Sequence, residues 1–204
     1  MPETTYLMSF TAGGLLHHES LKLAQLHEET PDWAALRSQV LDGNLLQMRT
    51  MEASKRIFRE VAPRLQALTA EEMDLLLTGT ASEQKHILWL GVCKRYRFIR
   101  DFAVEVVREK FLRMDLALSY DEYDIFFADK AEWHPEVEAV APSTRKKQRQ
   151  VVFKMLREAE LLSAEKQIVP ALLTPGTIEV IAADSPAHLA IFSVSPVEVE
   201  VWLP

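Results

Sequence analysis

The sequence predicts a mainly α-helical protein, and three observations support this fold class. Apolar residues recur at helical spacing through most of the chain. Ser and Thr stand at N-cap positions three residues before a Glu, and only one short segment alternates with the period of a strand. Of the 204 residues 48% are hydrophobic, enough for a packed core. We expect an N-terminal helical domain over residues 1–142 and a smaller C-terminal module over residues 143–204.

The N-terminal domain is predicted to be a bundle of amphipathic helices. After an extended entry and the flexible pair Gly13-Gly14, leucines at helical spacing mark a first helix. Thr30 is the expected N-cap of a second helix, with a proline at its first position. A long helix is expected from about Leu45, and Pro63 should kink or end it because its ring removes a helical hydrogen bond.

Two capping boxes mark later helices. TAEE at residues 69–72 opens one that Gly79 should close, and SYDE at residues 119–122 opens another. Between them, residues 87–99 are apolar almost all round apart from three cations. This pattern predicts a central buried helix that is interrupted near Tyr96 and continues beyond it.

The C-terminal module begins with the stretch STRKKQRQVVFKMLREAELLS at residues 143–163, for which Ser143 is the expected N-cap. Thr174-Pro175 and Ser185-Pro186 each predict the start of a short helix. VEVEV at residues 197–201 predicts a terminal strand.

The 143–163 helix is unusually basic for a chain with 30 Asp and Glu, 23 Lys and Arg, and a net charge of −7. At about 100° per residue its apolar side chains gather on one side, while Phe153 falls on the opposite, cationic side. Surface helices usually mix both signs, because like charges at i,i+4 spacing repel each other. Cations near a helix N-terminus are also unfavourable unless an anion binds there.

This face is therefore a candidate for contacts with nucleic-acid phosphates, with Gln150 nearest the bases. The predicted contact residues are Lys146, Lys147, Arg149, Gln150, Lys154 and Arg157. The alternative is that these cations pair with acids of the preceding segment, for example Glu132, Glu136 and Glu138.

A second basic face is expected on the long helix, at Arg49, Lys55, Arg56 and Arg59. Here Glu52 and Glu60 lie among the cations, so an internally paired surface is the alternative. The RYRF segment with Lys94 is a candidate for a third patch, and its alternative is a set of cations that reach solvent from the end of a buried helix.

Indications of catalysis or metal binding are weak. HHE at residues 17–19 is the only dense cluster of metal-type side chains, and adjacent helical residues point about 100° apart, so we expect no ion there. The single Cys93 lies in an apolar run and indicates packing rather than a nucleophile. We expect no enzymatic activity and no cofactor. No secretory signal and no apolar stretch long enough to span a bilayer are visible, which favours a cytoplasmic protein.

Four segments taken together resemble the BREX phage-defence accessory protein A family. They are SFTAGGLLHHES, LDGNLLQMRT with SKRIFREVAPRL, ILWLGVCKRYRFIRDFAVEVVREKF and STRKKQRQVVFKMLREAELL, and they extend over nearly the whole chain. The resemblance implies a non-enzymatic, mostly helical protein with helix-turn-helix-like or winged-helix-like modules. It also implies binding to double-stranded DNA beside other BREX components, without a membrane. In this interpretation the 143–163 helix is the recognition helix and the segment from Ile168 onward is a degenerate wing.

The rival interpretation is a helical adaptor that docks on other defence components without direct DNA contact. The acidic balance and the absence of Lys or Arg after Lys166 favour it. The oligomeric state is left open.

Overall fold

The computed structural model describes residues 5–11, 13–195 and 197, and within these ranges the protein is mainly helical, as predicted. The described part contains no extended strand. No helix in it has the length and apolar character needed to cross a bilayer. In chain order the helices are α1 (His17–Glu29), α2 (Trp33–Asp42), α3 (Met51–Leu65), α4 (Ala70–Thr78), α5 (Ala81–Arg95), α6 (Arg97–Phe102), the π-helical η1 (Ala103–Arg108), α7 (Glu109–Leu112), α8 (Tyr120–Ala131), α9 (Pro135–Glu138), α10 (Pro142–Glu158), α11 (Pro175–Asp184) and the 3-10 helix η2 (Pro186–Ile191).

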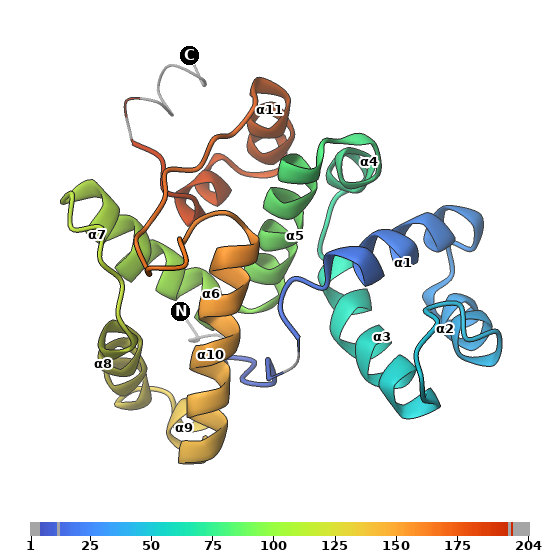
Figure 1. The fold of residues 1–204 in the computed structure, drawn as a ribbon, viewed down its shortest axis with the longest axis horizontal. Coiled ribbons are helices and arrows are strands. Elements are labelled where there is room, and N and C mark those ends of the chain that lie inside the picture. The colour runs from blue at the N-terminus through green and yellow to red at the C-terminus, as the bar shows by residue number, and fades with distance from the viewer. Residues whose placement is uncertain (1–4, 12, 196, 198–204) are drawn as a thin grey trace.

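The other helices surround α5, which crosses the middle of the molecule (Figure 1). It contacts α1, α3 and α4 on one side and α6, α10 and η2 on the other. Trp89 of α5 is fully buried and donates a hydrogen bond from Nε1 to the Ile191 carbonyl oxygen at 3.2 Å. The predicted central helix and its interruption are confirmed, because α5 ends at Arg95 and α6 begins at Arg97 with Tyr96 between them.

Side-chain caps fix the starts of α2, α3, α4, α5, α8 and α11. Both predicted capping boxes are confirmed, at Thr69 for α4 and at Ser119 for α8, and a third box at Thr80 opens α5. Gly79 follows the last residue of α4, and α3 ends two residues after Pro63. These local signals set where the capped helices begin.

Three predicted helix starts were wrong. α2 begins at Trp33, because Asp32 rather than Thr30 accepts the first N–H groups of the helix, from Ala34 at 3.4 Å and Ala35 at 2.9 Å. α3 begins at Met51 rather than near Leu45, with the Thr50 hydroxyl as its cap. α10 begins at Pro142, whose fixed φ suits the first helical position, so Ser143 lies inside the helix.

A short antiparallel pairing follows α10. Ile168 pairs with Leu162, and Gln167 pairs with Ala117 from the segment before α8. Backbone bonds from Ser163 to Gln167 (2.8 Å) and from Ile168 to Leu116 (2.7 Å) join the three segments. The paired segment forms a hairpin over residues 161–169, and most of the later described chain forms α11 and η2 at the predicted Thr174-Pro175 and Ser185-Pro186 starts. The degenerate wing expected from Ile168 onward stays a prediction.

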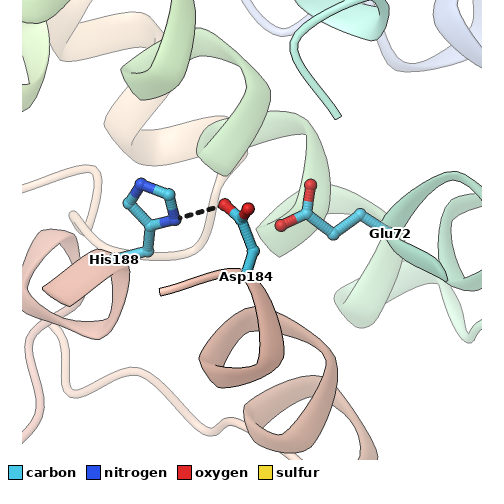
Figure 2. Close-up of side chains that lie close together, drawn as sticks. All are labelled: Glu72, Asp184 and His188. Atoms are coloured by element: carbon cyan, nitrogen blue, oxygen red, sulfur yellow. Dashed lines mark ion pairs between the residues drawn. The ribbon is translucent and has the colours of Figure 1, made fainter. Parts of the chain in front are cut away.

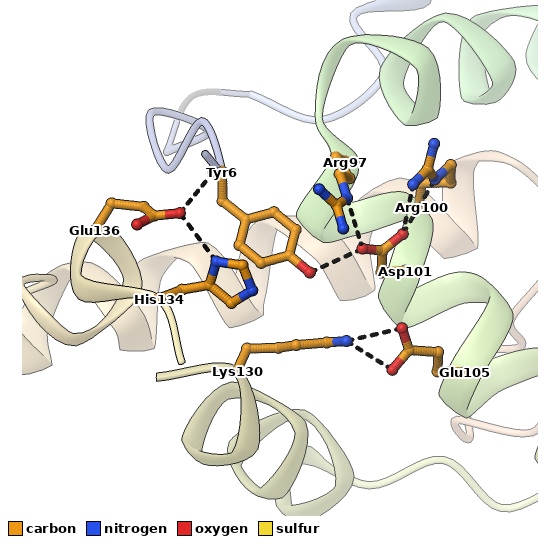
Figure 3. Close-up of polar contacts among 8 residues, drawn as sticks. All are labelled: Tyr6, Arg97, Arg100, Asp101, Glu105, Lys130, His134 and Glu136. Atoms are coloured by element: carbon orange, nitrogen blue, oxygen red, sulfur yellow. Dashed lines mark hydrogen bonds and ion pairs between the residues drawn. The ribbon is translucent and has the colours of Figure 1, made fainter. Parts of the chain in front are cut away.

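An extended N-terminal segment, residues 5–11, lies across α6, α9 and α10. Tyr6 donates from its backbone N–H to Glu136 at 2.7 Å and from its hydroxyl to Asp101 at 2.8 Å (Figure 3). The buried Gln148 of α10 donates to the Met8 carbonyl oxygen. Beyond it, the backbone N–H of Leu15 donates to Glu158 at 2.6 Å, so the segment connects α1 to the end of α10.

The predicted boundary at residue 142 stays a prediction. One cluster of buried hydrophobic residues contains members from both sides of it, including Trp89 and Leu156. The strand predicted at residues 197–201 falls almost entirely outside the described residues.

We expect Glu122→Gln to flatten the acid side of the stability profile. Partial burial opposes ionisation of Glu122, but hydrogen bonds from Ser119 and Lys110 outweigh it and lower the pKa of the carboxyl from 4.5 to about 2. A group with a depressed folded-state pKa stabilises the fold above its unfolded-state pKa, and this stabilisation is lost as the pH falls from about 4.5 to about 2. Urea unfolding at a series of pH values should show a smaller loss for the variant than for wild type. Equal losses would contradict this assignment.

Candidate nucleic-acid interface

Two of the basic side chains of α10 hold the helix against α8. Arg145 donates from Nε to the Asp124 carboxylate at 3.1 Å and from Nη2 to the Asp124 carbonyl oxygen at 2.7 Å. Arg149 donates to the same carboxylate. The guanidinium groups also lie 4.5 Å from the ring centroids of Phe127 and Tyr120, respectively. The acid that pairs with them is thus Asp124, and not the Glu132, Glu136 or Glu138 considered from the sequence.

The outer face of α10 carries the remaining predicted contact residues. All are exposed, and Lys154 makes an i,i+4 ion pair with Glu158 at 3.5 Å. Lys146, Lys147 and Arg157 form no ion pair with any described residue. The exposed set is Lys146, Lys147, Gln150, Lys154 and Arg157.

The placement of Phe153 on this outer face was wrong. Its side chain is fully buried, with its ring 4.7 Å from the ring of Tyr120 in an edge contact. The contact face of α10 is wider than the wheel indicates, because the start of α8 and the 161–169 hairpin cover it from the side. The other apolar positions assigned to the inner face, from Val151 to Leu162, are buried as predicted.

The first turn of α10 has no side-chain cap and no acidic residue. Pro142 has no N–H and the N–H of Arg145 bonds to the Ala141 carbonyl oxygen at 2.9 Å, so the uncapped N–H groups at this positive end of the helix dipole are those of Ser143 and Thr144, within one turn of Lys146 and Lys147. This combination of groups can bind an anion and is unfavourable without one.

The second predicted face is present on α3 and is only partly neutralised. Lys55 pairs with Glu52 at 2.8 Å, whereas the buried Glu60 pairs with Arg64 at 3.2 Å and not with the exposed set. A shallow cleft of about 410 Å³ beside these cations is lined by Lys55, Arg56, Arg59 and Arg37 of α2, among others. Among the four predicted cations of this face, Arg49, Arg56 and Arg59 are exposed and form no ion pair with the described part of the chain.

The candidate third patch is largely paired internally. Arg97 lies 3.3 Å and Arg100 2.9 Å from the Asp101 carboxylate (Figure 3). Lys94 points inward and contacts two acids, so within this segment only Arg95 is fully exposed. Most cations of this segment thus pair with acids of the protein itself and do not form an exposed basic patch.

Glu72, Asp184 and His188 form the one group of described residues whose ligand atoms are close enough together to hold a metal ion (Figure 2). Lys94 supplies the cation: its Nζ lies 2.6 Å from Glu72 Oε2 and 2.9 Å from Asp184 Oδ2. Hydrogen bonding from Lys94 lowers the pKa of Asp184, and burial together with the nearby ammonium lowers that of His188. The arrangement is an ion cluster, buried at Glu72 and open to solvent at Asp184, that ties α4 and α5 to α11.

The HHE segment gives no cluster of this kind. His17 Nε2 lies 2.9 Å from the Gln84 side-chain oxygen, and His18 is exposed. The absence of a metal ion there stays a prediction. Cys93 is buried, and burial raises the pKa of its thiol well above the usual range, which favours packing over nucleophilic chemistry.

Taken together, the fold and this surface define a helical protein with a basic helix, two of whose arginines pair with one aspartate of the neighbouring helix while its other cations are exposed. A profile of the BrxA family matches residues 4–185, and the chain belongs to this family. Among curated relatives, BREX protein BrxA of Bacillus cereus (strain H3081.97) is 26% identical over 184 residues, which cover 89% of this chain and 92% of that protein. BREX protein BrxA of Escherichia coli O9:H4 (strain HS) is 23% identical over 157 residues, which cover 77% of this chain and 74% of that protein.

A crystal structure of an uncharacterized protein from Magnetospirillum magneticum has the same fold. It superposes with a TM-score of 0.78 at 18% identity and covers 94% of this chain and 100% of that one. At this identity the likeness concerns the fold alone.

Sequence inspection missed Asp124, which decides which cations of α10 stay free. It carries no motif of its own, and only its position on the inner side of the SYDE helix indicates that it faces α10. No contact was predicted for Lys166 either. It lies in the turn of the 161–169 hairpin, and its ammonium is 4.1 Å from the ring centroid of Tyr120 in α8.

Replacing Asp124 with Ala should lower the free energy of unfolding by roughly 1 kcal/mol, because two partly exposed ion pairs are lost. It should also release Arg145 and Arg149 to the surface. Asp129→Ala, an exposed position on the same helix, is the control and should leave urea unfolding nearly unchanged. If both variants unfold alike, Asp124 does not hold α10.

Lys94→Met should destabilise the fold by about 3–5 kcal/mol, because it leaves the fully buried Glu72 carboxylate without its counter-charge. The double variant Lys94→Met with Glu72→Gln should recover part of this loss, since the amide keeps an oxygen for the Thr69 cap. Urea unfolding of both variants measures the difference. A double variant no more stable than Lys94→Met alone would contradict this explanation.

Proposed function

We propose that this chain is a non-enzymatic component of a bacterial BREX phage-defence system that binds double-stranded DNA through α10. Family membership and the two relatives named BREX protein BrxA support the assignment to the system. The observation that carries DNA binding is the outer face of α10. Its four exposed cations face solvent, and Glu158 pairs with only one of them. Phosphate binding is the chemistry that such a face favours.

The order of elements around α10 supports a winged-helix module. The order along the chain is α7, a short paired segment at residues 116–118, α8, α10 and the hairpin at residues 161–169. In that arrangement α8 and α10 are the two helices of a helix-turn-helix, with α9 in the turn, and α10 is the recognition helix. Arg145 and Arg149 then fix α10 against α8, while the outer cations contact DNA.

The uncapped start of α10 fits the same role. Its free N–H groups together with Lys146 and Lys147 form a site for one backbone phosphate. Gln150 lies one turn further along the exposed face and can reach a base edge. Phosphate contacts set affinity in this proposal, and Gln150 contributes what sequence preference there is.

The α3 face is the second DNA contact in this proposal. α2 and α3 also form a helix-turn-helix-like pair, with Arg56 and Arg59 exposed on the second helix of the pair and Arg49 exposed in the loop just before it. Like α10, this face has one lysine paired with an acid and three cations that form no ion pair with a described residue.

The quadruple variant Lys146→Ala, Lys147→Ala, Lys154→Ala and Arg157→Ala should flatten the dependence of DNA affinity on salt. Each neutralised phosphate adds about 0.9 to the slope of log affinity against log salt, so the slope should fall by roughly 3 to 4. Affinity should fall similarly for unrelated duplexes, because phosphate contacts carry little sequence information. A salt titration of duplex binding measures both effects.

The control for this experiment removes Arg95 and Arg113, two exposed cations outside both faces. Its slope should match wild type. A separate variant at Arg49, Arg56 and Arg59 measures the α3 share. Thermal melts should be unchanged for the quadruple variant, since exposed charges contribute little stability. Equal slopes for quadruple variant and wild type would exclude α10 as the DNA contact and favour an adaptor that binds only proteins.

A further inference from the structure

Two shallow clefts lie side by side along α4. The first, about 490 Å³, lies between α4, α1 and the start of α2, and its walls include Trp33, Met73 and Leu77. The second, about 540 Å³, lies between α4 and α11 and is lined by Leu75 and Val180 among others. Ala70 and Asp74 line both, so one edge of α4 separates the two clefts.

The apolar side chains in these clefts are only half covered. Trp33, Met73, Leu75 and Leu77 each rest on the core with one side and stay partly open on the other. At Gly176, at the start of α11, an added Cβ would meet no atom within 4 Å, so the second cleft is open at that end. Half-exposed apolar side chains gathered along one helix are typical of a surface that another protein covers.

The charge around both clefts has one sign. No Lys or Arg of the described chain lines either of them, although the chain has 23 such residues. The acids on their walls are exposed and form no ion pair with a described residue, in contrast to Glu72 on the inner side of the same helix. These acids are Glu28, Glu71, Asp74 and Glu179.

We propose that this surface binds a basic amphipathic α-helix of another protein. Leucine-type side chains on one face of such a helix would enter the two clefts on either side of Ala70, and Lys or Arg residues flanking them would lie over the four carboxylates. Helix-in-groove binding of this kind takes its affinity from apolar anchors, and complementary charge sets orientation and rate.

The other occupants fit less well. DNA would meet four uncompensated carboxylates. A second copy of this chain offers α10 as its most basic helix, but the apolar face of α10 is buried in its own core and cannot enter the clefts. In Figure 1, α4 and α11 lie at the top of the molecule and the start of α10 at the bottom, so a partner here leaves that end of α10 free.

The test uses a synthetic leucine–lysine peptide of about four helical turns, with leucines at i, i+3, i+4 and i+7 spacing, as the probe. Fluorescence anisotropy measures its binding to the full chain, and amide chemical shifts map the contact. We expect shifts concentrated on α4 and the start of α11. A variant with Glu28→Gln, Glu71→Gln, Asp74→Asn and Glu179→Gln should bind the peptide at least about tenfold more weakly.

The matched control neutralises four other exposed carboxylates, on or beside α8 and α9: Asp121→Asn, Asp129→Asn, Glu132→Gln and Glu138→Gln. It has the same net charge as the first variant and should bind the peptide like wild type. A leucine–glutamate peptide of the same pattern should not bind. Equal weakening by both variants, shifts centred away from α4, or no peptide binding would overturn the proposal. So would a wild-type dimer that dissociates on the α4 substitutions, because a second copy would then be the occupant.

DNA binding is measured on the same two variants. The proposal expects the α4 variant to keep its DNA affinity, or to gain slightly from the lower negative charge. The α10 quadruple variant should lose DNA binding and keep peptide binding. The proposal for α4 and the proposal for α10 can therefore be contradicted separately.

Discussion

The burial of residues 86–93 of α5 on every side is the constraint on which the rest of the structure depends. A helix that is apolar all round has no face for solvent, so helices from both ends of the chain must cover it. α3 approaches it most closely at Gly91, where an added Cβ would lie 2.9 Å from the Arg64 carbonyl oxygen. Any side chain at position 91 would push α3 away from α5, together with α1 and α2, which pack on α3. The polar ends of α5 are equally fixed: a capping box with Glu83 starts it, and Lys94 near its last turn neutralises Glu72 and Asp184. One helix thus sets the places of α3, α4 and α11.

The N-terminal segment carries this constraint to α10. Tyr6 and Gln148 attach residues 5–11 to the helices around Asp101 and to α10 itself, and Glu158 binds the backbone at Leu15. At Gly14, φ is +152° and an added Cβ would lie 2.3 Å from the Glu158 carboxylate, so only glycine allows this approach. The end of α10 is therefore fixed to the start of α1, and the cations of α10 have a defined position relative to the rest of the protein.

The sequence predicted what depends on neighbouring residues in the chain and missed what depends on contacts between distant ones. The capping boxes at Thr69 and Ser119, the break at Tyr96 and the short helices after Thr174 and Ser185 all follow from local chemistry. The N-caps predicted at Thr30 and Ser143 were wrong because a better cap or a proline lies one or two residues away. The exposure predicted for Phe153 was wrong, and the pairing of Asp124 was missed, for another reason. A helical wheel shows which side of α10 is apolar, but not how far α8 and the hairpin extend around it. The basic segment was thus correctly predicted to be a helix, whereas the division of its cations into internal and exposed ones required the three-dimensional fold.

That division explains how an acidic protein can present a basic face. Asp124 and Asp101 pair with arginines that stabilise the fold, so they do not neutralise Lys146, Lys147 or Arg157. The acids that remain unpaired around α4 lie in another part of the molecule. At physiological ionic strength exposed charges interact over only about 8 Å, so the field at each surface depends on its own charges more than on the net charge of −7. A protein built in this way can hold a polyanion at one surface and a basic protein at another. Under that physical condition DNA binding and docking on other defence components are compatible in one small chain.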